Sequence, residues 1–213
     1  MIKDLDRQIL EYCRFCNPQE KERILYESDN FYLMLSLGPI VEGYCLLISK
    51  EHYSCCAAIS SGLIAEFKEI YLKVKSILIE EYGSCICYEH GRAGACLIPM
   101  EGNKHCFHAH MHFVPMATDL NYLVQRDYDE VTLDSLDSFF EVYTTNNSKP
   151  YLYVEDSNSK NIYFIDTVIR RQYLRHKAAV SIEKENLWNW IEHQGWDSIN
   201  SALKVLPRHF KKL

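Results

Sequence analysis

The sequence predicts an α+β protein in which one long helix covers an antiparallel sheet, followed by a smaller C-terminal α/β extension. Short apolar runs of strand length lie on both sides of a single helical pattern, which is typical of a sheet with one covering helix. The polar segment 144–150 (TTNNSKP) separates these patterns from a second, shorter set. A hydrophobic content of 47% in 213 residues is enough for a sizeable core.

Each expected element follows from its own local pattern. Apolar residues recur at spacings of three and four from Leu63 to Leu78 and Gly83 follows, which predicts a helix over residues 61–82. Strands are expected at residues 23–26, 31–36, 44–49, 85–88 and 105–115, and a hairpin at 151–154 and 161–165. Helical segments are expected around 170–180 and 188–205. The pattern changes after Pro115, so we place the main domain at 1–118 and the extension at 119–213.

Composition restricts the compartment and the partners. The N-terminal run MIKDLDRQIL has neither a basic start nor an apolar core, and no apolar stretch is long enough to span a bilayer, so we expect a cytoplasmic protein without a membrane partner. A net charge of −6 makes nucleic acid an unlikely partner. Nine cysteines are an odd number in such a chain, which favours reduced thiols or a metal site over disulfides.

Three histidines carry the strongest functional signal. His108, His110 and His112 alternate within one apolar run, so a strand would present all three rings on one face, about 7 Å apart. Three surface histidines placed by chance would not explain this spacing. Such rings could bind a catalytic zinc, or one of them could act as a nucleophile. Residues 105–116 contain no Asp or Glu, which argues against a zinc hydrolase site on this strand.

A second signal is the pair Cys13 and Cys16, whose CxxC spacing suits a structural zinc site. A redox pair and two unrelated buried thiols are the alternatives. His52, directly after an expected strand, and His108 are candidates for the two missing ligands.

Taken together, CRFC, GPIVEGYCLLISKEHY and HAHMHFVP, in this order over about residues 10–116, resemble the histidine triad (HIT) proteins. The resemblance implies a HIT-like fold and one structural zinc bound by Cys13, Cys16, His52 and His108. It also implies that a homodimer is possible.

The same resemblance implies catalysis by His110 and His112. His110 would attack the α-phosphorus of a nucleotide or dinucleoside polyphosphate and form a nucleotidyl-histidine that water or another acceptor then cleaves. Its inner N–H would need an acceptor, and the resemblance suggests the backbone carbonyl of His108. His112 would contact phosphate oxygens. The expected activity is that of a nucleotide hydrolase or nucleotidyltransferase.

Four further positions are expected to bind the nucleotide. Ser36 stands where many HIT proteins have an Asp that contacts the ribose, and His105 stands where they often have a small hydroxyl residue. Glu89 and His90 form part of an EHG run similar to one in a bacterial branch, and either side chain could face the phosphate.

The extension is more ambiguous. The runs PYLYVED, RRQYLRHKAA and LWNWIEHQGWD resemble the tail of bacterial HIT hydrolases that act on dinucleoside polyphosphates. The basic residues between 170 and 177 could reach substrate phosphates or form a solvated helix face. A related branch, similar to debranching-associated splicing factors, suggests the alternative function: a non-catalytic module that binds a nucleotide or an RNA end.

Overall fold

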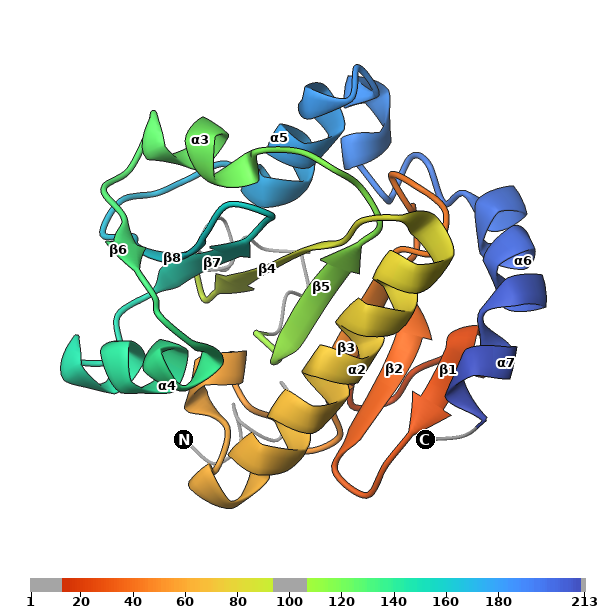
Figure 1. Ribbon diagram of the computed structural model, residues 1–213, viewed down its shortest axis with the longest axis horizontal. Helices are drawn as coiled ribbons and strands as arrows, with labels where there is room; N and C mark the ends of the chain where they lie inside the picture. The colour runs from red at the N-terminus through yellow and green to blue at the C-terminus, as the bar shows by residue number, and fades with distance from the viewer. Residues whose placement is uncertain (1–12, 94–106, 212–213) are drawn as a thin grey trace.

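The computed structural model describes residues 13–93 and 107–211, and its centre is one eight-stranded sheet (Figure 1). Neighbouring strands pair antiparallel in the order β1-β2-β3-β5-β4-β7-β8-β6. The strands are β1 (Ile24–Glu27), β2 (Phe31–Leu35), β3 (Cys45–Ser49), β4 (Ile86–Gly91), β5 (His110–Val114), β6 (Val131–Thr132), β7 (Tyr151–Glu155) and β8 (Lys160–Phe164). The predicted antiparallel α+β fold is confirmed.

Helices cover both faces of this sheet. The helices are α2 (Ile64–Tyr82), α3 (Leu120–Gln125), α4 (Leu136–Thr145), α5 (Tyr173–Ser181), α6 (Trp196–Val205) and α7 (Pro207–Phe210). Short 3-10 turns are η1 (Lys21–Arg23), η2 (Cys56–Ala58), η3 (Ser61–Leu63) and η5 (Glu185–Trp188). Apolar residues of α2, α4, α6 and α7 belong to the core on one face, and those of α3 and α5 belong to the core on the other. The predicted long helix is α2, preceded by the turn η3, and Gly83 ends it in the left-handed conformation.

Residues 119–213, expected as a separate extension, continue the same sheet. Strand β7 pairs with β4 from Cys87↔Glu155 to Gly91↔Tyr151, and β8 then forms the predicted hairpin with β7. The chain afterwards returns to the opposite edge, where α6 and α7 lie beside β1 (Figure 1). A boundary at residue 118 therefore divides the sequence without dividing the sheet.

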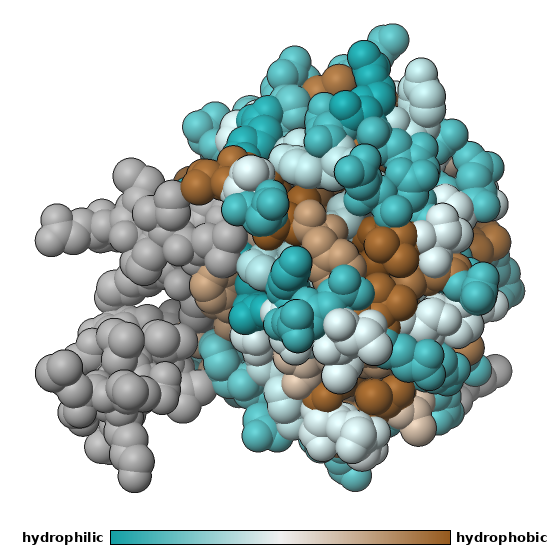
Figure 2. Space-filling view, turned by 90° about the vertical axis from the view of Figure 1, so that its left-hand side faces the viewer, coloured by the Kyte–Doolittle hydropathy of each residue, from teal (hydrophilic) through white to brown (hydrophobic). Residues whose placement is uncertain are grey.

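The far edge of the sheet is short and exposed. Strand β6 has two residues, and Val131 is 40% exposed there. So short an edge offers few backbone groups to another chain. Seen from this side, the surface mixes hydrophilic side chains with smaller hydrophobic areas (Figure 2). The predicted homodimer stays a prediction.

Membrane insertion finds no support in the helices. Within residues 13–93 and 107–211, none of them combines the length and the hydrophobicity that crossing a bilayer requires.

Strand β5 lies between β3 and β4 and carries the histidines. It begins at His110, later than the predicted start at residue 105, and His108 precedes it in an extended segment. The Ala109 N–H donates to the Tyr53 carbonyl at 2.7 Å, which fixes this segment against the loop after β3. Met111 and Phe113 belong to the core under α2, so the alternation predicted for this strand holds.

Glu89 is a buried carboxyl on the α2 side of the sheet. Its Oε1 accepts from the Cys56 backbone N–H at 2.7 Å, and its Oε2 accepts from the Tyr151 hydroxyl at 2.5 Å. Burial raises the pKa of Glu89 from 4.5 to about 7, although these hydrogen bonds act in the opposite direction. In the unfolded chain the same group ionises near its ordinary value.

This shift predicts that Glu89 destabilises the fold as the pH rises. Between about pH 4.5 and 7 the unfolded chain has lost the proton and the native protein retains it, so stability falls by up to about 1.4 kcal/mol per pH unit. Replacing Glu89 with Gln should remove this component. Urea unfolding between pH 5 and 7.5 should show the variant gaining stability relative to wild type as the pH rises, whereas Glu80→Gln, at an exposed position of α2, should not. A constant difference between Glu89→Gln and wild type would contradict the raised pKa.

Candidate active site and metal centre

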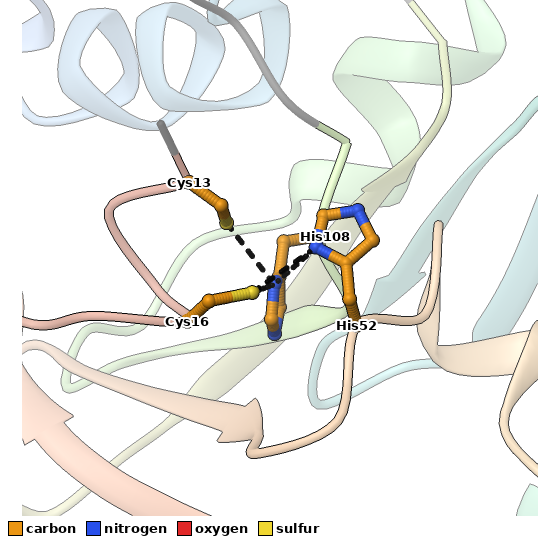
Figure 3. A group of neighbouring side chains, drawn as sticks. All are labelled: Cys13, Cys16, His52 and His108. Carbon is orange, nitrogen blue, oxygen red and sulfur yellow. Dashed lines mark hydrogen bonds between the residues drawn. The ribbon is translucent and has the colours of Figure 1, made fainter. Parts of the chain in front are cut away.

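Four side chains from three separate segments meet beside the start of β5 (Figure 3). Cys13 and Cys16 come from the N-terminal loop, His52 follows β3, and His108 precedes β5. Their nearest ligand atoms all lie within 4.8 Å of one another. This is the set that the sequence predicted as metal ligands, and the structure brings all four together.

The distances within this Cys-His cluster suit tetrahedral metal coordination. The Nδ1 atom of His108 lies 3.3 Å from the Cys13 sulfur, 3.6 Å from the Cys16 sulfur and 3.2 Å from Nδ1 of His52. The Cys16 sulfur lies 3.3 Å from the same nitrogen of His52. Metal bonds of about 2.0–2.3 Å at tetrahedral angles would place ligand atoms about 3.3–3.8 Å apart. The cluster could therefore hold a metal ion.

The outer hydrogen bond of His108 fixes which nitrogen faces the cluster. Its Nε2 lies 2.7 Å from the Ser49 carbonyl oxygen, and a carbonyl can only accept, so Nε2 carries the proton. In the neutral ring Nδ1 is then unprotonated, and Nδ1 is the atom directed at Cys13, Cys16 and His52. An N–H bound to a backbone carbonyl is the usual support of a metal-binding imidazole.

His110 is held by the backbone of the same residue. Its Nδ1 lies 2.6 Å from the His108 carbonyl oxygen, so Nδ1 must donate and Nε2 is the unprotonated nitrogen of the neutral ring. Burial lowers the pKa of His110 to about 4, although the hydrogen bond to the carbonyl acts in the opposite direction. Phe15, which lies between the two cysteines of the loop, packs against the ring at 4.8 Å between centroids. The ring is thus neutral and oriented.

His112 is held by two tyrosines. Its Nδ1 lies 2.7 Å from the Tyr44 hydroxyl, which in turn lies 2.5 Å from the Tyr88 hydroxyl. The ring stacks on Tyr88 at 4.6 Å and lies 4.8 Å from the ring of His110. Burial, and then the neighbouring His110, His90 and Arg175, lower its pKa well below the ordinary value.

These rings line a cavity of about 250 Å³. The cavity reaches His108, His110 and His112 along one wall, together with Ser36 and His90. A second part of the lining is apolar and consists of Phe15, Met34, Leu37, Leu46 and Trp190. The space therefore combines imidazoles at one side with a hydrophobic slot at the other, as a small ligand with one polar and one flat apolar part requires.

The four positions expected to bind a nucleotide do not all reach this cavity. Ser36 lines it, and its hydroxyl donates to the Leu37 carbonyl at 3.1 Å. His90 lines it as well, and its Nε2 accepts from the Leu174 backbone N–H at 3.1 Å. Burial lowers the pKa of His90 to about 3, so this ring is neutral. His105 lies outside the described residues.

Glu89 is the position that the structure places elsewhere. Successive residues of β4 point to opposite faces, so Glu89 and His90 cannot both face the phosphate. His90 takes the cavity side, and Glu89 contacts Cys56 and Tyr151 on the α2 side. The expectation that Glu89 binds the nucleotide is therefore corrected: its carboxyl supports the fold below the strand.

Sequence reasoning missed several residues of this site. Phe15 could have been found from its place inside the CxxC loop. Tyr44 and Tyr88 carry no motif, and only the register of β3, β4 and β5 brings their hydroxyls to His112. Arg175 was one of several basic residues in a helical pattern, and the sequence could not single it out.

Comparison with known proteins agrees with this site. The family model described as scavenger mRNA decapping enzyme C-term binding matches residues 10–142, which includes the Cys-His cluster and all three histidines of the triad. No curated protein matches the chain.

Solved structures with a similar fold include three proteins of low sequence identity. A HIT-like protein involved in cell-cycle regulation from Bartonella henselae has a TM-score of 0.35 and 15% identity over 44% of this chain and 65% of its own, just under two thirds of its length. A hypothetical histidine triad nucleotide-binding protein from Sulfolobus tokodaii has a TM-score of 0.39 and 17% identity over 62% and 87%. Yeast Ap4A phosphorylase in complex with AMP has a TM-score of 0.43 and 13% identity over 85% and 78%. The match to the family model over more than half of its length shows that the chain belongs to the family described as scavenger mRNA decapping enzyme C-term binding, a HIT-like family, and is a histidine triad protein.

Proposed function

We propose that this protein is a nucleotide hydrolase or nucleotidyltransferase that acts at the α-phosphate of a nucleotide or dinucleoside polyphosphate through His110. One observation carries this proposal: the 2.6 Å hydrogen bond from Nδ1 of His110 to the His108 carbonyl. This bond leaves the other ring nitrogen unprotonated in a ring that lines the cavity. An oriented imidazole with a free lone pair is an effective nucleophile toward phosphorus.

The reaction would proceed in two displacements. In the first, Nε2 of His110 forms a bond to the α-phosphorus while the bond from phosphorus to the leaving-group oxygen breaks, and the leaving group departs with the electron pair. In the second, the oxygen of water or of another acceptor bonds to phosphorus and the P–N bond breaks, returning the electron pair to His110. The acceptor's proton passes to the departing phosphate or to solvent. The Nδ1 proton remains on the ring throughout, held by the His108 carbonyl.

His112 is suited to bind the phosphate oxygens. If Tyr88 donates to Tyr44 and Tyr44 donates to Nδ1 of His112, the other nitrogen of His112 carries a proton. That N–H could donate to a phosphate oxygen next to His110, whose ring centroid is 4.8 Å away. A fixed donor in a buried site stabilises the charge that develops on the phosphate in the transition state.

The rest of the nucleotide would occupy the apolar part of the cavity. Met34, Leu37 and Leu46 offer flat contact to a base, and the Ser36 hydroxyl could accept from a ribose hydroxyl. The description of the family, a binding region of an mRNA decapping enzyme, supports a nucleotide ligand of this kind.

A zinc ion in the Cys-His cluster would serve the structure. It would join the N-terminal loop, the end of β3 and the start of β5, and so hold the His108 carbonyl in place for His110. Two thiolates and two imidazoles fill four tetrahedral positions, which is the composition of a closed structural site. The role of the cluster is therefore to position the nucleophile.

We expect about one zinc ion per chain when metal content is measured on the purified protein. Cys16→Ser should lower this content, and it should lower the melting temperature, because the loop and β5 lose their common attachment. Cys85→Ala is a matched control, since Cys85 is also buried but lies outside the cluster. Equal zinc content in wild type and Cys16→Ser would contradict the assignment of this cluster.

Replacing His110 with Ala should lower turnover of a nucleotide substrate at least about a thousand-fold, equivalent to a barrier increase of about 4 kcal/mol, because no other group can take over the nucleophile's position. The variant should still fold, since the ring is partly exposed to the cavity. Steady-state assays with dinucleoside polyphosphates and nucleoside phosphoramidates would measure the loss.

His193→Ala serves as the control, because His193 is exposed and does not line the cavity. Normal turnover by His110→Ala would contradict the proposal. Saturable nucleotide binding by wild type without any product would instead support the binding module.

A further inference from the structure

Three polar residues of the C-terminal half line the same cavity as the histidines and have no part in the mechanism above. Arg171 and Gln172 precede helix α5, and Arg175 lies in its first turn. The Leu174 backbone N–H, which donates to His90 at 3.1 Å, joins this helix end to β4. We call Arg171, Gln172 and Arg175 the α5 cluster.

Arg175 places a positive charge in the interior near His112. The residue is 4% exposed, and its guanidinium donates to the backbone carbonyls of Gly38 and Trp188. It also lies 5.0 Å above the ring of Tyr44, the partner of His112. Its partners carry no formal negative charge, and among residues 13–93 and 107–211 no carboxylate forms an ion pair with it. A buried guanidinium is normally paired with an anion.

Gln172 has an amide group without partners. Both Nε2 and Oε1 are buried and make no hydrogen bond within the part of the chain that the structure describes. The backbone of Gln172 has φ +55°, a left-handed conformation that residues other than glycine seldom adopt. Buried unsatisfied polar groups and backbone strain are both costly, and strain of this kind is concentrated at ligand-binding positions.

The charges of the cavity lining are unbalanced in the same direction. Four arginines and one glutamate line the cavity, although the whole chain carries a net charge of −6. Glu20 lies 3.5 Å from Arg14 and 3.3 Å from Arg23, so it pairs with these two. Arg171 and Arg175 are left without a carboxylate in the described ranges. The excess positive charge thus lies at the α5 cluster.

The α5 cluster and the Cys-His cluster lie at opposite ends of the triad. The ring of His108 belongs to the Cys-His cluster, whereas Arg175 contacts Tyr44, the partner of His112. His110 lies between the two ends. A phosphate at His110 would therefore have the α5 cluster on the His112 side.

We propose that Arg171, Gln172 and Arg175 form an anion subsite for phosphates beyond the α-phosphate. The subsite selects substrates whose leaving group is a phosphate chain over those with an uncharged or amine leaving group. This inference rests on the proposed function for its place in the reaction, but binding of a phosphate chain can be measured without turnover. Guanidinium groups and an amide N–H are the donors that phosphate oxygens require.

The first test measures binding of inorganic tripolyphosphate by calorimetry. Arg171→Gln should weaken this binding at least about ten-fold, because a charge-assisted contact is lost. Arg171 makes no ion pair or hydrogen bond in the described part of the chain, so its replacement leaves no protein group unpaired. Arg170→Gln is the matched control: Arg170 is the preceding residue, is exposed, lies over the ring of Trp188 and does not line the cavity. Equal affinities for the Arg171 and Arg170 variants would overturn the subsite.

Gln172→Gly provides a second variant that changes no charge. Glycine adopts the left-handed conformation without strain, so the melting temperature should not fall, while tripolyphosphate binding should weaken through loss of the amide. Unchanged binding by this variant would remove Gln172 from the subsite.

Turnover separates the subsite from the proposed function. Arg171→Gln should lower kcat/KM for a dinucleoside polyphosphate about ten-fold or more and leave kcat/KM for a nucleoside phosphoramidate unchanged. An equal loss with both substrates would contradict a subsite for the leaving group. If wild type turns over neither substrate, the proposed function fails, and tripolyphosphate binding that depends on Arg171 would still support the anion subsite.

Discussion

His108 connects the two parts of the site through two different groups. Its ring is fixed by the Ser49 carbonyl and directed at the two cysteines and His52, while its own carbonyl accepts the Nδ1 proton of His110. Any shift of this residue would change both contacts at once. The orientation of His110 therefore depends on the loop that carries Cys13 and Cys16, although neither cysteine is close enough to take part in chemistry at phosphorus.

Burial keeps the histidines of the cavity neutral, and this changes what the arginines must supply. Burial lowers the pKa of His90, His110 and His112 below their ordinary values, so none of the three rings brings a positive charge at neutral pH. The formal positive charge beside the triad comes from arginine side chains instead. This division leaves a free lone pair on His110 while the cavity still attracts an anion.

The fold and much of the site could be predicted from local patterns, because the decisive residues lie in short segments. Alternation placed His110 and His112 on one face, and the CxxC loop identified the cysteines. The continuation of the sheet through β7 could not be predicted, because a hairpin pattern does not say which strand it will pair with. Glu89 was misplaced for a related reason: only the register of β4 decides which of two adjacent side chains faces the cavity. Arg175 was hidden among basic neighbours until the packing of α5 buried it.

The most direct test of the central claim is the mass of the protein quenched, without acid, during turnover of a nucleotide substrate. The account predicts that a fraction of wild-type chains carries one nucleotidyl group, that peptide mapping places it on His110, and that the group disappears as the substrate is exhausted. Turnover at an undiminished rate with no adduct, or with an adduct on another residue, would contradict the account.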